Sequence, residues 1–160
     1  IQVKEPTIKL DRETANIYPP ATKTVTFTVT VNGVQGNSGV TWTSGNTKVA
    51  TVSNGKVTAV SKGTATITAK ANGKLAKAKV TVKDPYANVS PTSGTIKIGK
   101  TLQLTTNYAP ASTGTPSYSS SNKKVATVDS KGVVKGVKAG TATITVKVNG
   151  VTAKAELTVK

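Results

Sequence analysis

The sequence predicts an all-β protein built from two tandem antiparallel β-sandwiches. Three observations predict it: a segment that occurs twice, apolar residues that alternate with polar ones, and hairpin turns at regular intervals. The 160 residues include 29 Thr and 22 Val, and such β-branched residues suit a pleated, half-buried sheet. No segment has the 3.6-residue apolar period of a helix.

The second half of the chain repeats the first. The segment VATV occurs at 49–52 and at 125–128, and GTATIT occurs at 63–68 and at 140–145. A repeat of this length indicates two domains, which we place at residues 1–83 and 84–160. The linker at the boundary is so short that we expect the two modules end to end, with limited hinging at Asp84 and Pro85.

Alternation places the larger apolar residues of each strand on its inward face. In residues 24–31 every second residue is Val or Phe, which predicts one continuous strand. Many other inward positions carry Ala, so we expect a thin core. The candidate core residues are Phe27, Trp42, Ile67, Tyr118 and Ile144.

The turns agree with this pattern. Asn-Gly occurs at 32–33, 54–55, 72–73 and 149–150, each time between apolar segments. Asn-Gly is a strong hairpin signal because both residues accept a positive φ. The last two pairs would join the final two strands of each domain. With turns at these intervals, we expect about seven strands in each sandwich.

Both copies resemble the bacterial immunoglobulin-like domain of group 2. The first copy has the family's pattern as Trp42, SGN at 44–46, KVATV at 48–52, GTATIT at 63–68 and VTV at 80–82. The second has it as Tyr118, KVATV at 124–128, GTATIT at 140–145 and LTV at 157–159. The first copy departs from the pattern at its opening turn, residues 18–21. The resemblance implies two immunoglobulin-like sandwiches in which Trp42 and Tyr118 plug the cores.

The resemblance also implies modules of secreted or surface-exposed bacterial or phage proteins. The first expectation is a non-catalytic spacer that presents or supports adhesion. Three alternatives stay open: an adhesion module, a self-assembling surface-layer or filament subunit, and an accessory domain of a secreted carbohydrate-active enzyme. The candidate partners are a cell-surface or cell-wall polysaccharide, a host receptor, neighbouring repeats and further copies of the chain. We expect an extracellular location, on a bacterial surface, secreted, or on a phage virion.

Residues for catalysis are scarce. There is no Cys and no His, which excludes Ser-His and Cys-His arrangements and zinc sites built from those residues. None of the six acidic residues has a counterpart in the other repeat. We therefore expect no catalytic residue, cofactor or metal. Asp11 and Glu13 would share a face of an extended strand, where they are either solvated edge charges or a weak calcium site, and Asp84 offers a similar weak candidate.

The net charge of +16 comes from 22 basic and 6 acidic residues, and 21 of the basic residues are Lys. These lysines are scattered singly along the chain, as solubilising residues at strand edges are. Diffuse attraction to an anionic surface is the alternative. Specific nucleic-acid binding is not expected, because Arg12 is the only arginine and aromatic residues do not alternate with basic ones. No apolar run is long enough to span a membrane.

Three tyrosines remain as candidate ligand-binding residues once the core aromatics are set aside. Tyr18 and Tyr108 lie beside prolines, in loops that roughly correspond between the repeats. Tyr86 lies at the domain junction, where packing between modules is the alternative role. A carbohydrate or receptor site would use these loops.

Overall fold

The computed structural model describes residues 4–160, which contain strands and turns but no helix. The chain divides into two compact units, one ending at Asp84 and one beginning at Pro85. The predicted all-β class and tandem sandwiches are confirmed. In the part that the structure describes, no helix is long and apolar enough to cross a membrane.

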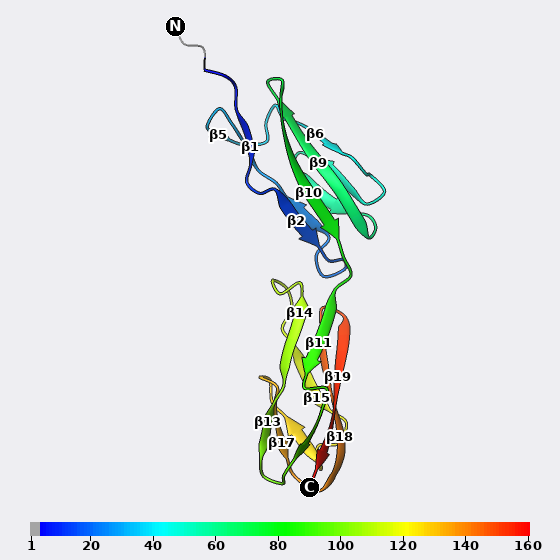
Figure 1. Cartoon of the computed structure of the whole chain (residues 1–160). Coiled ribbons are helices and arrows are strands. Elements are labelled where there is room, and N and C mark those ends of the chain that lie inside the picture. Colours follow the sequence, from blue (N-terminus) through cyan, green and yellow to red (C-terminus); the bar gives the residue numbers. More distant parts are fainter. Residues whose placement is uncertain (1–3) are drawn as a thin grey trace. The chain divides into compact units, whose positions relative to one another are not determined.

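Two layers form the first unit (Figure 1). One is a four-stranded sheet of order β2-β10-β9-β6. The facing layer consists of two three-stranded sheets, β1-β4-β5 and β3-β8-β7. The strands are β1 Ile8–Leu10, β2 Thr14–Ile17, β3 Thr24–Thr26, β4 Val29–Val31, β5 Val34–Gln35, β6 Thr41–Ser44, β7 Ala50–Ser53, β8 Lys56–Ala59, β9 Gly63–Ala71 and β10 Lys74–Val82.

The second unit repeats this arrangement. Its four-stranded sheet has the order β12-β19-β18-β15, and it faces the sheets β11-β14 and β13-β17-β16. Nothing equivalent to β5 accompanies β14 among the described residues. The strands are β11 Tyr86–Ser90, β12 Ser93–Ile96, β13 Thr101–Gln103, β14 Thr105–Ala109, β15 Ser117–Ser120, β16 Ala126–Val128, β17 Val133–Gly136, β18 Gly140–Val148 and β19 Val151–Val159.

The Asn-Gly pairs form the predicted hairpin turns. The four Asn residues have φ between 48° and 52°, and the Gly that follows each has φ between 75° and 83°. Positive φ at both positions matches the right-handed twist of the strands that the turn joins. Two of the pairs join the longest hairpins, β9–β10 and β18–β19, as expected.

The prediction of one continuous strand over residues 24–31 is wrong. The strand breaks at Phe27 and Thr28, where it changes partner: β3 pairs with β8, and β4 pairs with β1. The inward alternation continues through the break, because Phe27 and Val29 are both fully buried. The alternation therefore gave the correct face but could not detect the change of partner.

The broken strands also explain the strand number. Residues 4–84 contain ten strand segments and residues 85–160 contain nine. Four pairs of consecutive segments each change partner in this way: β1 and β2, β3 and β4, β11 and β12, and β13 and β14. If each pair is counted as one broken strand, the second unit has the seven expected strands and the first has eight. The additional strand is β5, a two-residue edge strand.

Each core draws residues from both layers. Of the candidate core residues, Phe27, Ile67 and Ile144 are fully buried. Trp42 and Tyr118 lie on the outer strands β6 and β15, where they are half-buried and pack against the cores. The Tyr118 hydroxyl is paired with Thr106 Oγ1 at 2.9 Å, whereas the buried Trp42 Nε1 has no partner.

We expect Trp42→Ala to lower the unfolding free energy of the first unit by about 3 kcal/mol, because it leaves a cavity beside a thin core. Trp42→Phe should cost much less, because it also removes an unpaired buried donor. Chemical denaturation followed by circular dichroism measures both. Equal stability of the parent and the Ala variant would show that the ring does not pack against the core.

Candidate functional site

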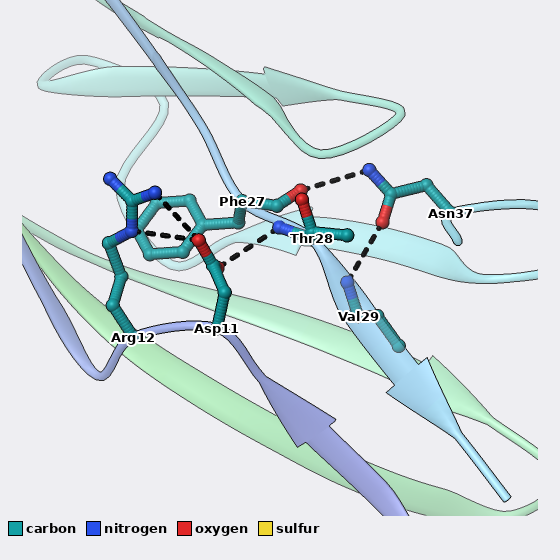
Figure 2. A network of polar contacts seen from close by, with 6 residues as sticks. All are labelled: Asp11, Arg12, Phe27, Thr28, Val29 and Asn37. Carbon is teal, nitrogen blue, oxygen red and sulfur yellow. Dashed lines mark hydrogen bonds and ion pairs between the residues drawn. The ribbon is translucent and has the colours of Figure 1, made fainter. Parts of the chain in front are cut away.

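In the first unit, the side chains of Asn37 and Asp11 bind the backbone groups at the break between β3 and β4 (Figure 2). The amide of Asn37 donates from Nδ2 to Phe27 O at 2.9 Å and to Asn54 O at 3.1 Å. Its Oδ1 accepts the N–H of Val29 at 3.1 Å. One side chain thus pairs three backbone groups that a regular ladder would otherwise have to pair.

Asp11 binds the N–H and C=O groups of Thr28, the other residue at the break. Its Oδ1 accepts the N–H of Thr28 at 3.0 Å, and the backbone N–H of Asp11 donates to Thr28 O at 2.9 Å. Its Oδ2 accepts two bonds from the guanidinium of Arg12, which lies 5.8 Å from the centre of the Phe27 ring. Burial raises the pKa of Asp11, but the Thr28 bond and Arg12 outweigh this and hold it below its usual value.

We call the side chains that bind the backbone at a strand break the latch: Asn37 and Asp11 in the first unit. The latch of the first unit requires glycine at position 55. A Cβ atom built there would lie 2.5 Å from Phe27 O and closer still to Nδ2 of Asn37. Gly55 also has φ of 80° and accepts the N–H of Phe27 at 2.8 Å. Any side chain at Gly55 would therefore push Asn37 away from the two carbonyl groups.

The second unit closes its equivalent break with a different residue. The amide Nε2 of Gln103 donates to Leu104 O at 2.8 Å and to Lys131 O at 2.9 Å. These carbonyls correspond to those of Phe27 and Asn54, 77 positions earlier. Gln103 is adjacent to the break, whereas Asn37 is ten residues away from it. The two repeats thus bind the same pair of carbonyls from different sequence positions.

Sequence reasoning did not find this latch. Asn37 and Gln103 occupy unrelated positions in the repeat, and the carbonyls that they bind lie up to 28 residues away. The position of the break becomes visible only when the change of strand partner is known. An isolated amide residue at a predicted loop or outward strand position gives no usable signal.

The two units also share a parallel strand pair that includes the last strand of each unit. The last strand of each four-stranded sheet pairs in parallel with a strand from the start of the same unit, β10 with β2 and β19 with β12. In the first unit, Lys79 N donates to Glu13 O and Lys83 N donates to Ile17 O, both at 2.8 Å. Because the two strands are parallel, tension between the ends of a unit shears this ladder.

The structure separates the two candidate tyrosines of the second unit. Tyr86 and Tyr108 lie on the paired strands β11 and β14, opposite Ala109 and Ala87 respectively, so they point to opposite faces. Tyr86 is 44% exposed, and Tyr108 is half-buried. Tyr18 belongs to the first unit, after β2.

The expectation that Tyr18 and Tyr108 lie in corresponding loops is wrong. Tyr18 follows the strand β2, whose counterpart is β12, so its counterpart is Lys97. Tyr108 is within β14, the counterpart of β4. Adjacent prolines made the two segments look alike, although they are at different points of the fold.

The acidic residues form no metal centre in residues 4–160, where no three potential ligands cluster. The carboxylate of Asp11 is engaged by Thr28 and Arg12, and that of Asp84 pairs with Lys62. Asp129 accepts the backbone N–H groups of Lys131 and Val133 in a turn. These three carboxylates therefore bind backbone N–H groups or basic side chains of the same unit.

A shallow groove runs over the outer face of each four-stranded sheet. The groove of the second unit has a volume of about 560 Å³ and that of the first about 390 Å³. The groove of the second unit is lined mainly by Ser and Thr hydroxyl groups, with one carboxylate, from Glu156. No aromatic ring lines either groove, so neither offers the stacking surface that sugar binding usually uses.

We expect Asn37→Asp to destabilise the first unit by about 2 kcal/mol at pH 7, because a carboxylate oxygen would face two carbonyl oxygens where the amide donates. These contacts should raise the pKa of the introduced carboxyl above about 3.9. The variant should therefore be closest to the parent below pH 4 and lose stability as the pH rises. Denaturation at several pH values, with exposed Asn16→Asp as the control, measures this; equal effects of both would contradict the latch.

Asp11→Asn should lower the stability of the first unit by about 1 kcal/mol at pH 7. Because the pKa of Asp11 is lowered in the folded state, its stabilising contribution is present above pH 4 and is lost as the pH falls through the folded pKa. The difference between parent and variant should shrink accordingly below pH 4. Exposed Glu13→Gln is the control, and a difference independent of pH would contradict this role of the carboxylate.

A family model for the bacterial Ig-like domain, group 2, matches residues 6–82 and again residues 86–159. Among curated proteins, a 3-O-α-D-galactosyl-α-L-arabinofuranosidase of Bifidobacterium longum subsp. longum is 54% identical over 52 residues. This match covers 31% of the chain and 5% of that enzyme. The chain therefore spans only a small part of this relative.

Among solved structures, two fragments of the surface layer protein SbsC have a similar fold. Its domains 1–6 match with a TM-score of 0.50 and 22% identity, over 99% of this chain and 28% of that one. Its domains 4–9 match with the same score and identity, over 100% and 31%. The family model covers nearly all of both units, and the chain therefore belongs to the bacterial Ig-like domain family, group 2, of which it contains two tandem copies.

Proposed function

We propose that this chain is a non-catalytic spacer of an extracellular bacterial or phage surface protein, in which it presents or supports adhesion by another part of its parent. The observation that carries the proposal is the parallel pairing of the first and last strands of each unit's four-stranded sheet. A spacer on a surface is held at both ends, so it must keep its fold under tension. Membership of the family and the fold shared with surface-layer domains support the location.

The parallel ladder resists tension for a geometric reason. Force enters the first unit at the start of β2 and leaves at the end of β10, which are opposite ends of the paired segment. The hydrogen bonds between these strands lie across the direction of force, so they must break together rather than one by one. The second unit has the same geometry between β12 and β19.

The latch at the strand break supports the same role. Asp11, between β1 and β2, binds Thr28, which lies between β3 and β4. The start of the unit is therefore bonded to the β3–β4 segment as well as to β10. Because several buried positions of the first unit are alanines, which pack little surface, we expect such backbone bonds to matter for its resistance to opening.

The decisive test stretches the chain from its two ends in a single-molecule instrument. We expect Ala15→Pro to lower the unfolding force of the first unit, because the backbone of residue 15, like those of Glu13 and Ile17, faces β10, and proline cannot donate to this ladder. Asn16→Pro is the matched control, since its N–H points to the free edge of β2. The second unit, unchanged in both variants, provides an internal reference.

Two results would overturn the proposed mechanical role. One is an equal loss of unfolding force in both proline variants, which would mean that the parallel ladder does not set the resistance. The other is unfolding of the parent units at forces no higher than those for peeling a hairpin open from its turn. The chain has no cysteine, so cysteine attachment points can be introduced at will for that comparison.

A second candidate is an accessory module of a secreted carbohydrate-active enzyme. The 54% identity to a segment of a bifidobacterial glycosidase favours it. A spacer within such an enzyme and a spacer within a surface-layer protein would look alike at this level, since both hold another domain at a distance. The coding sequence on either side of the two repeats discriminates them, because a hydrolase domain there would identify the first.

A further inference from the structure

Lysines that are far apart in the sequence gather at one end of the second unit, the end marked C in Figure 1. All are exposed, and they come from β17, the loops before β13, β16 and β18, and the end of β19. Backbone hydrogen bonds hold these segments together: Ile98 N to Lys160 O, Gly99 N to Gly136 O, and Lys138 N to Val125 O. We name this cluster the basic pole: Lys97, Lys100, Lys124, Lys135, Lys138 and Lys160.

No side-chain carboxylate of residues 85–160 neutralises the basic pole. This part of the chain has ten lysines and two acids, a net charge of +8. Asp129 lies in the turn at the far end of the β16–β17 hairpin, where backbone groups occupy it. Glu156 lies three residues before the end of β19, about 10 Å along the strand. Neither is in an ion pair, since the three pairs among the described residues all belong to the first unit.

The first unit carries less net charge at its equivalent end, where it has four lysines: Lys23, Lys48, Lys62 and Lys83. Three lysines of the basic pole, Lys97, Lys135 and Lys138, correspond by their backbone pairing to Tyr18, Thr58 and Ser61. The first unit also places a carboxylate there, because Asp84 pairs with Lys62. The other three lysines of the basic pole recur in the first unit, so the repeat supplies half of the cluster and the second unit adds Lys97, Lys135 and Lys138 to it.

Exposed aliphatic residues at the same end do not point to a lipid surface. Val137 is 45% exposed, but its counterpart in the first unit, Val60, is 58% exposed. Aliphatic exposure is thus a feature of the repeat, in contrast to Lys97, Lys135 and Lys138. Nucleic acid is disfavoured as well, because the basic pole contains neither an arginine nor an aromatic ring.

We propose that the basic pole binds an anionic polysaccharide, one that carries a carboxylate or a phosphate on each repeating unit. Lysine ammonium groups on several flexible stems suit such a chain, because they are point charges that follow spaced anions without a fixed fork geometry. Binding would give the spacer a lateral attachment to a charged cell-wall or capsular polymer. This inference goes beyond the mechanical role and does not depend on it.

The test compares two triple variants of the whole chain with equal net charge. Lys97→Gln, Lys135→Thr and Lys138→Ser together remove half of the basic pole, while Lys70→Gln, Lys77→Gln and Lys79→Gln remove three outward lysines from the first unit's sheet. Fluorescently labelled polygalacturonate and a glycerol phosphate polymer are the probes, with neutral dextran as the control. Binding is measured by anisotropy from about 0.05 to 0.5 M salt.

We expect the pole variant to lose at least tenfold in affinity at 0.15 M salt, and the slope of log affinity against log salt to fall by about two. The sheet variant should change affinity less than threefold, and both should melt like the parent. Preference for one polymer identifies the anion as carboxylate or phosphate. Equal losses in both variants, no binding by the parent, or tighter binding to single-stranded DNA or to phosphatidylglycerol vesicles would overturn the proposal.

Discussion

The structure depends on pairing the backbone groups at the point where a strand changes partner. Some of these groups are partly buried, and an N–H or C=O group left without a partner there would cost about 1 kcal/mol or more, which the thin cores with their many alanines have little to offset. In the first unit Asn37 and Asp11 supply the missing partners, and in the second Gln103 does so. These side chains allow one strand to pair with β8 along one half and with β1 along the other.

The two repeats preserve the requirement and vary the residue that meets it. The amides of Asn37 and Gln103 reach the same pair of carbonyls from opposite sides of the break in sequence. A similar exchange separates Trp42 from Tyr118, since only the tyrosine finds a partner, at Thr106, where the first unit has Val29. Geometry is thus repeated more faithfully than side-chain identity, as expected where a fold accepts several solutions to one hydrogen-bonding problem.

Mechanical and electrostatic properties lie on different parts of each unit. The parallel ladders, to which we assign resistance to tension, join an edge strand to its neighbour in each four-stranded sheet. They use backbone groups, which are insensitive to most substitutions on the exposed face. The lysines lie on outward strand positions and loops, where the two units differ without disturbing those ladders. Under the proposed spacer role, surface charge could therefore change from one repeat to the next without altering the ladders.

The sequence by itself determined the fold class, the tandem repeat, the Asn-Gly hairpins and the inward face of residues 24–31, because alternation and turn propensity are local properties. It also placed Phe27, Ile67 and Ile144 correctly in the interior. Only the tertiary structure decided where strands break, which amide closes each break, and that Tyr86 and Tyr108 point apart. It also gathered singly spaced lysines such as Lys97 and Lys138 into one cluster, because those contacts join segments that lie tens of residues apart in the chain.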